Sequence, residues 1–169
     1  MMASIKLAGL RVLVVGAARE GTAAAAFLAR QGAVVRLADA KPLAALSQDL
    51  TGLAELGVML EGGVAQPTLD GVELVVLSPG VPPFAPVVQA ARQRGLPLSS
   101  EPRLFTQLFG GRVVGVTGSS GKTTTTSLLG EMLRQAGLGT LVGGNIGLPL
   151  ISTLDGEATQ SQLAVLELS

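Results

Sequence analysis

The sequence contains no cysteine, histidine, tryptophan or tyrosine, and its four phenylalanines are its only aromatic residues. The lack of cysteine excludes a disulfide framework and thiolate chemistry. The lack of histidine removes the commonest acid–base side chain. Chemistry carried by these residues must therefore use carboxylates, lysines, a metal ion or positioned phosphates. Because 47% of the residues are hydrophobic and most of these are Ala, Val and Leu, we expect a core of small aliphatic side chains, as in α/β proteins.

No excess of charge and no long apolar run is present. Twelve basic residues balance twelve acidic ones, so nothing favours a nucleic acid or an anionic membrane surface as a partner. No apolar stretch reaches the roughly 18 residues of a membrane span. The first ten residues, MMASIKLAGL, do not form a secretory signal. We therefore expect a cytoplasmic protein with no membrane insertion and no nucleic-acid partner.

The stretch GVTGSSGKTTTT, residues 115–126, organises the rest of the chain. The β-branched run at 112–117 predicts a buried strand, and the residues from Lys122 onward predict a helix. Between them, Gly118 and Gly121 allow backbone N–H groups to turn inward around an anion. The helix N-terminus, the Lys122 ammonium and the Thr123 hydroxyl complete an arrangement that is typical of phosphate and Mg²⁺ binding.

The spacing of this loop differs from the common pattern G-x-x-x-x-G-K-[ST]. That pattern requires glycine at position 116, where this sequence has valine. The alternative is a turn rich in serine and glycine before an ordinary helix. A Lys-Thr pair that follows a glycine between a strand and a helix favours the phosphate-binding interpretation.

The first hundred residues predict alternating strands and helices, and hence a Rossmann-like parallel sheet. Strands are expected at 11–15, 33–38, 57–60, 73–77 and 96–98, and helices at 22–31, 41–56 and 85–94. A short helix at 101–109 is expected to lead to the second unit. The predicted fold class is α/β, with a Rossmann-like domain over residues 1–107. The start of a second α/β domain, of the P-loop ATPase type, is predicted over residues 108–169.

Gly16, Gly21 and Asp39 match the logic of a nucleotide-binding turn, in which glycines precede a helix and an acid ends the next strand. Ala18 stands where the dinucleotide fingerprint requires glycine, so a dinucleotide cofactor is disfavoured. A turn without any ligand stays open as an alternative. The loop at 78–83, SPGVPP, follows the fourth strand at the edge where such sheets bind ligands, but it is also compatible with a stiff connector.

The second half of the chain offers one further carboxylate. The segment at 139–147 is rich in glycine and includes Asn145; a short helix is expected after Pro149 and a polar loop at 155–162. The strand at 163–168 ends near Glu167, which is placed either to support Mg²⁺ or to be an exposed acid. Two strands, 112–117 and 163–168, are expected in this second sheet. Because so small a sheet buries little area, we expect the chain to be the first part of a longer protein.

Three segments together, VVGVTGSSGKTTTTSLLGEML, GGNIGLPL and VLELS, closely resemble the Mur ligases of peptidoglycan synthesis. The resemblance covers essentially the whole chain and is best for the members that add D-glutamate. It implies ATP- and Mg²⁺-dependent formation of an amide bond between D-glutamate and UDP-N-acetylmuramoyl-L-alanine, through an acyl phosphate. The chain alone is expected to be inactive. A sister ligase that adds L-alanine, or a nucleotide-binding module without catalysis, are the alternatives.

The resemblance also implies roles for individual residues. Lys122 is the candidate catalytic residue because it would hold the β- and γ-phosphates, and Thr123 and Glu167 would support the metal ion. The implied ATP-binding set is Gly118, Ser119, Ser120, Gly121, Lys122, Thr123 and Thr124. The implied UDP-sugar-binding set is Gly16, Gly21, Asp39, Gly80 and Asn145.

The sequence departs from the family pattern in three places. At one of them, Lys41 replaces a common arginine, which keeps the charge but loses the bidentate geometry. Ser120 stands where asparagine is usual before the last glycine of the loop, which implies altered loop stability rather than lost binding. Arg19 and Glu20 stand where an apolar residue and threonine are usual beside the uridine diphosphate. A carboxylate near a diphosphate is unfavourable unless Arg19 offsets its charge.

Overall fold

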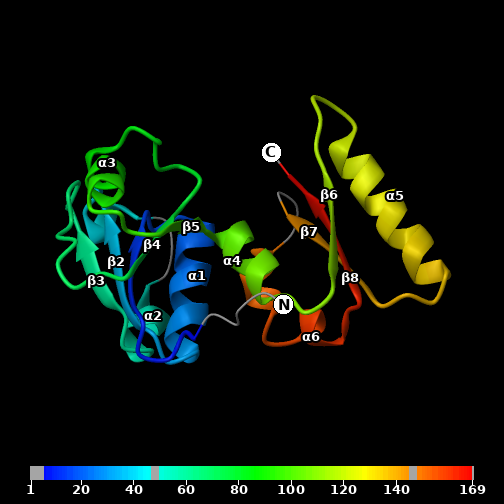
Figure 1. Ribbon diagram of the computed structural model, residues 1–169, viewed down its shortest axis with the longest axis horizontal. Helices are drawn as coiled ribbons and strands as arrows, with labels where there is room; N and C mark the ends of the chain where they lie inside the picture. Colours follow the sequence, from blue (N-terminus) through cyan, green and yellow to red (C-terminus); the bar gives the residue numbers. More distant parts are fainter. Residues whose placement is uncertain (1–5, 47–49, 145–147, 169) are drawn as a thin grey trace. The chain divides into compact units, whose positions relative to one another are not determined.

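A computed structural model describes residues 6–46, 50–144 and 148–168. The chain divides between Arg103 and Leu104 into two compact units, each of which contains its own parallel sheet (Figure 1). Among the described residues, none of the helices combines the length and the apolar character needed to cross a bilayer.

The first unit is a five-stranded parallel sheet in the order β3-β2-β1-β4-β5. Its elements are β1 (Arg11–Val15), α1 (Arg19–Arg30), β2 (Val34–Asp39), the 3₁₀ turn η1 (Leu43–Ala45), α2 (Thr51–Glu55), β3 (Met59–Gly62), β4 (Leu74–Leu77), α3 (Pro86–Gln93) and β5 (Leu98–Ser100). The strand order reverses direction between β1 and β4, which is where open α/β sheets form their ligand crevice. The predicted Rossmann-like fold is confirmed.

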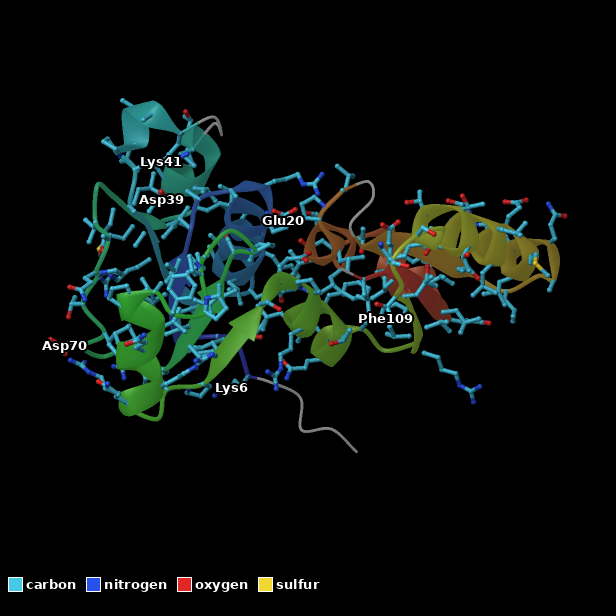
Figure 2. All side chains as sticks on the ribbon, turned by 90° about the horizontal axis from the view of Figure 1, so that it is seen from above. Lys6, Glu20, Asp39, Lys41, Asp70 and Phe109 are labelled. Atoms are coloured by element: carbon cyan, nitrogen blue, oxygen red, sulfur yellow. The ribbon has the colours of Figure 1, made fainter. Side chains whose placement is uncertain are left out.

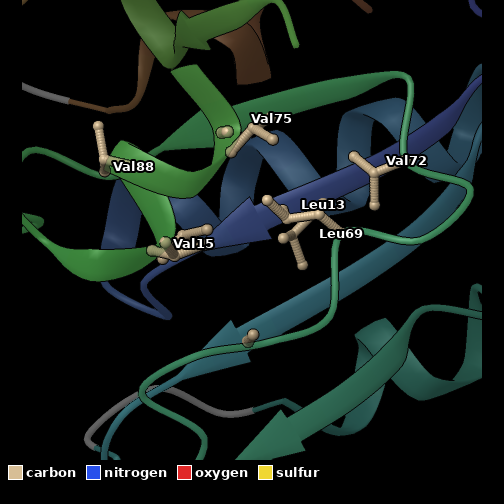
Figure 3. Packing of buried hydrophobic residues seen from close by; sticks show 9 residues of the cluster. Leu13, Val15, Leu69, Val72, Val75 and Val88 are labelled. Carbon is tan, nitrogen blue, oxygen red and sulfur yellow. The ribbon is translucent and has the colours of Figure 1, made fainter. Parts of the chain in front are cut away.

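The core of this unit is built from small aliphatic side chains on both faces of the sheet. Leu13, Val15 and Val75 pack with Val88 of α3 on one face (Figure 3). Right-handed crossovers place α1 on the other face. There its fully buried Ala24 and Ala25 let the helix lie close to the strands. Burial on both faces explains why β1 is a continuous apolar run rather than an alternating one.

The helix predicted over residues 41–56 is wrong. The described part of this stretch contains only the turn η1 and the five-residue helix α2, and Leu46 between them has an extended backbone. The cause is a long-range contact. The N–H of Gly63 donates to the Lys41 carbonyl and that of Val64 to the Asp39 carbonyl, both at 2.9 Å, so the chain leaving β2 stays extended.

Gly16 and Gly21 bring α1 close to the ends of β1 and β4. Gly16 has φ +93°, and its carbonyl accepts a hydrogen bond of 2.6 Å from the Ser78 hydroxyl. Helix α1 begins at Arg19, three residues before the predicted start at residue 22, so Gly21 lies inside its first turn. A Cβ atom on Gly21 would collide with both the Gly16 carbonyl and the Ser78 hydroxyl. Glycine is therefore required there for packing, whatever the unit binds.

The second unit contains a three-stranded parallel sheet in the order β6-β8-β7. After α4 (Glu101–Leu108), its elements are β6 (Arg112–Val116), α5 (Lys122–Gln135), β7 (Thr140–Gly144), the 3₁₀ turn η2 (Leu150–Thr153), α6 (Glu157–Gln160) and β8 (Leu163–Glu167). Its core includes Phe105 of α4 and Phe109, the residue that follows this helix, and the two rings stack with centroids 5.2 Å apart.

Strand β7 and helix α6 were not predicted from the sequence. The sequence shows residues 139–147 only as rich in glycine, and residues 155–162 were expected to be a polar loop. The glycines of β7 serve close packing rather than chain reversal. A Cβ on Gly143 would meet the Leu150 side chain, and one on Gly144 would collide with the backbone of Glu167. The second sheet therefore has three strands in the described residues instead of the expected two.

Strand β6 was expected to be buried, and this is also wrong. Val113 and Val114 are 38% and 37% exposed. The reason is that β6 pairs with β8 on one side, whereas the described residues provide no strand for its other side. Helix α5 packs mainly on β7 and β8 and leaves much of β6 uncovered.

Two matched glycine substitutions test the packing of the first unit. Gly21→Ala should lower the free energy of unfolding by about 1–3 kcal/mol, because the added methyl group overfills a tight contact. Gly80→Ala should leave it close to wild type, since nothing lies within 4 Å of a Cβ at Gly80. Thermal unfolding followed by circular dichroism makes the comparison. Equal melting curves for the two variants would contradict this account.

Candidate functional site

The loop between β6 and α5 depends on two glycines in left-handed conformations. Gly118 has φ +147° and Gly121 has φ +74°, values that other residues rarely adopt. Helix α5 begins at Lys122, immediately after Gly121. The predicted succession of strand, glycine turn, Lys-Thr and helix is thus present in the structure.

The backbone N–H groups of this loop form a set of free donors. Thr125 is the first residue of α5 whose N–H finds a backbone acceptor, the Gly121 carbonyl at 2.9 Å. The described residues supply no acceptor for the N–H groups of residues 118–124. Free donors at the N-terminus of a 14-residue helix, together with the helix dipole, favour an anion at this position.

The Lys122 ammonium lies over the same loop. Its Nζ donates to the Gly118 carbonyl at 2.8 Å, an exposed contact with a neutral group. Lys122 takes part in none of the ion pairs within the described ranges. The cation is therefore not neutralised and can move from a carbonyl to an anionic ligand.

Thr123 and Glu167 are brought together by the sheet. Strand β8 pairs with β6 so that Glu167 lies beside Val116, the last residue before the loop. The Thr123 hydroxyl donates to the Glu167 carboxylate at 2.8 Å, across 44 residues of sequence. Glu167 is only 7% exposed, so the alternative of an exposed acid at the strand end does not hold.

The surroundings of Glu167 fit a hard divalent cation. No lysine or arginine pairs with Glu167 in the part of the chain that the structure describes. A buried carboxylate without a cationic partner is unfavourable. No group of three or more His, Cys, Asp and Glu side chains gathers among the described residues. One carboxylate with one hydroxyl suits Mg²⁺, which takes few protein ligands and completes its shell with water and phosphate oxygens.

The remaining loop residues are less constrained. Ser119, Ser120 and Thr124 are exposed, and no side-chain hydrogen bond of theirs lies within the described ranges. Thr126, which sequence reasoning did not select, is fully buried, and its hydroxyl has no partner in the described structure. The four-threonine run gave no signal that distinguished it.

In the first unit, the Asp39 carboxylate reaches the Gly16 turn because β2 pairs directly with β1. One oxygen accepts the N–H of Ala17 at 2.7 Å, and the other accepts the N–H of Lys41 at 2.8 Å. Figure 2 labels Asp39 and Lys41 in the first unit. Asp39 therefore anchors the turn in addition to any contact with a ligand. Gly80 is exposed on the loop after β4. Asn145 lies outside the described residues.

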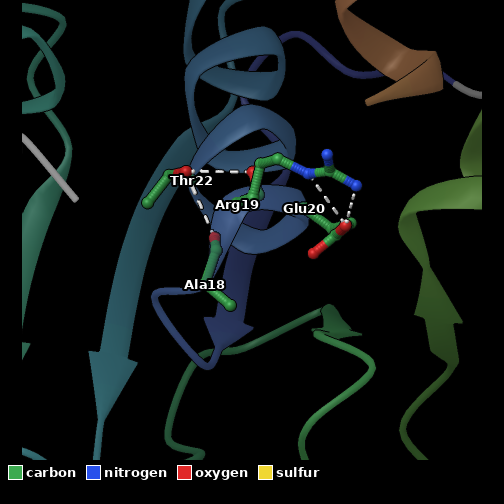
Figure 4. Close-up of polar contacts among 4 residues, drawn as sticks. All are labelled: Ala18, Arg19, Glu20 and Thr22. Atoms are coloured by element: carbon green, nitrogen blue, oxygen red, sulfur yellow. Dashed lines mark hydrogen bonds and ion pairs between the residues drawn. The ribbon is translucent and has the colours of Figure 1, made fainter. Parts of the chain in front are cut away.

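Arg19 and Glu20 form an ion pair at the start of α1 (Figure 4). The Arg19 guanidinium donates twice to one oxygen of Glu20, at 3.2 and 2.9 Å. Arg19 thus offsets the charge of Glu20, as the sequence required if an anion is to approach. The Thr22 hydroxyl lies within hydrogen-bond distance of two carbonyls in the same turn, those of Ala18 at 3.2 Å and Arg19 at 3.0 Å.

Comparison with known proteins is consistent across both units. Residues 10–100 match the Mur ligase MurD-like N-terminal domain, and residues 116–169 match the Mur ligase middle domain. The UDP-N-acetylmuramoylalanine--D-glutamate ligase of Solibacter usitatus is 45% identical over 166 residues, which cover 98% of this chain and 36% of that protein. The protein of the same name in Koribacter versatilis is 45% identical over 162 residues, covering 95% of this chain and 36% of that protein.

Solved structures show the same relationship. A UDP-N-acetylmuramate:L-alanyl-gamma-D-glutamyl-meso-diaminopimelate ligase from Neisseria meningitides has a TM-score of 0.55 and 29% identity, covering 95% of this chain and 52% of that one. The chain spans about a third of the length of its curated relatives, as 36% coverage shows. Both domain matches and the relatives agree, and the chain belongs to the Mur ligase family.

Proposed function

We propose that this chain supplies the UDP-sugar-binding and ATP-binding parts of a ligase that adds D-glutamate to UDP-N-acetylmuramoyl-L-alanine. The observation that carries the proposal is the Thr123–Glu167 pair beside a loop of free N–H donors. The names of the relatives that are 45% identical support D-glutamate rather than L-alanine as the added amino acid. Because the chain covers 36% of those relatives, activity belongs to the longer protein in this proposal.

In the proposed second domain, residues 108–169, the free N–H groups of Gly118 to Thr124 would bind the phosphates of ATP. The Lys122 ammonium would leave the Gly118 carbonyl for the β- and γ-phosphate oxygens. Thr123 and Glu167 would hold Mg²⁺, which when bound neutralises charge on the transferring phosphoryl group. These groups would let an anionic carboxylate approach an anionic phosphate, which is the main electrostatic obstacle to forming an acyl phosphate.

In the proposed first domain, residues 1–107, the UDP-sugar would lie across the carboxyl ends of β2, β1 and β4. The Asp39 carboxylate has lone pairs left after its two backbone contacts and could accept from uridine hydroxyl or N–H groups. Gly16, Gly21 and Gly80 would shape the turns around the diphosphate. Use of ATP and of a UDP-linked precursor supports a cytoplasmic location.

Removing the ammonium at position 122 should separate the two binding sites. Lys122→Ala should weaken binding of Mg·ATP by about 10- to 150-fold, the range expected for lost charge-assisted hydrogen bonds. Binding of UDP-N-acetylmuramoyl-L-alanine should not change. Isothermal titration calorimetry measures both affinities, and Lys6→Ala, which removes an exposed lysine in the other unit, is the matched control. Equal loss of both ligands would contradict the division into two sites.

Neutralising the buried carboxylate should affect metal dependence without harming the fold. In Glu167→Gln, the side-chain oxygen can still accept from Thr123, but the negative charge is lost. We expect ATP to bind equally well with Mg²⁺ and with EDTA, whereas wild type should bind it more tightly with Mg²⁺. The melting temperature of the ligand-free variant should be unchanged or higher, because a buried charge without a cationic partner is removed.

Glu131→Gln is the matched control for this experiment, since Glu131 is an exposed acid on α5. It should leave the effect of Mg²⁺ intact. A Glu167→Gln variant that still binds ATP more tightly with Mg²⁺ than with EDTA, to the same extent as wild type, would rule out Glu167 as a support for the metal.

A further inference from the structure

Three features lie in a row along the carboxyl edge of the first sheet. The strand order places β2, β1 and β4 side by side. Asp39 ends β2, the Gly16 turn follows β1, and the loop of residues 78–85 follows β4. Since neighbouring strands lie about 4.8 Å apart, the ends of β2 and β4 are separated by roughly 10 Å. A nucleoside diphosphate sugar is long enough to reach from one to the other.

The loop after β4 is held in place by its own hydrogen bonds. The N–H of Val81 donates to the Ser78 carbonyl at 3.0 Å, and that of Ala85 donates to the Pro82 carbonyl at 2.9 Å. The Gln89 side chain donates to the Phe84 carbonyl at 3.1 Å. The two adjacent prolines at 82 and 83 restrict the backbone further. The loop is therefore ordered before any ligand arrives.

This ordered loop presents an aromatic ring to solvent. Phe84 is 74% exposed, more than any other large apolar side chain that the structure describes. The other three phenylalanines are buried, with exposures of 8% or less. The exposed ring of Phe84 offers a flat apolar face at the carboxyl edge of the sheet. Because its loop is already ordered, a ligand that binds there pays little entropy for ordering the loop.

We propose that Phe84 is a specificity-determining residue whose ring stacks on the sugar of the UDP-sugar substrate; this inference rests on the proposed function. The strand order sets the direction in which the UDP-sugar would lie on the sheet edge. The Asp39 carboxylate suits the hydroxyl and N–H donors of uridine at the β2 end, and the Gly16 turn lies between. The sugar then extends over the loop after β4, where the C–H groups of one sugar face can lie against the ring of Phe84.

Calorimetric titration of the chain with UDP and with UDP-N-acetylmuramoyl-L-alanine tests the assignment. Phe84→Ala should bind the UDP-sugar about tenfold more weakly and UDP with unchanged affinity. Phe84→Tyr keeps a flat ring and should restore the UDP-sugar affinity, whereas Phe84→Leu, which keeps apolar bulk alone, should not. Val34→Ala is the matched control, because Val34 is 57% exposed at the opposite end of β2.

Each other outcome overturns the inference in a distinguishable way. Equal loss of UDP and UDP-sugar affinity in Phe84→Ala would place the ring on the nucleotide, and no loss would remove it from the site. Full affinity in Phe84→Leu would contradict stacking. If the wild-type chain binds neither ligand, the proposed function of the first unit fails together with the inference.

Discussion

The parallel pairing of β6 with β8 is the constraint on which the candidate ATP site depends. Its register sets Glu167 beside Val116, so the carboxylate ends next to the loop that opens after β6. The Thr123 hydroxyl donates a hydrogen bond of 2.8 Å to this carboxylate. A shift of one residue in that register would turn the Glu167 side chain to the other face of the sheet. Gly144 of β7 supports the arrangement from the other side, because any side chain there would collide with the Glu167 backbone.

Several features could be predicted from the sequence because local signals and tertiary structure agree. Strand β1 has the predicted bounds, since a strand buried on both faces must be a continuous apolar run. The helix after Gly121 begins at the predicted Lys122, where glycine conformation and helix start reinforce one another. The five-stranded sheet of the first unit followed from the alternation of apolar runs with helical stretches. The family resemblance seen in the sequence agrees with a relative that is 45% identical over 166 residues.

The features that sequence reasoning missed depend on contacts between distant residues. Residues 41–46 do not form an α-helix, because the backbone N–H groups of residues 63 and 64 donate to the carbonyls of the chain that leaves β2. Strand β7 was hidden by glycines that are needed for close packing on Leu150 and Glu167. The exposure of β6 depends on which neighbours it has, and an apolar run carries no information about that. The two backbone contacts of Asp39 and the exposed ring of Phe84 likewise required the folded chain.

The central claim is that the N–H groups after β6 converge on a polyphosphate. Amide chemical shifts of the ¹⁵N-labelled chain, recorded during a titration with Mg·ADP, test it most directly. The account predicts that the largest shift changes fall on residues 118–124, where donors are free and the helix dipole is focused. The claim would be contradicted if the chemical shifts of these amides did not change, or if the largest shift changes fell on residues 16–21 of the first unit.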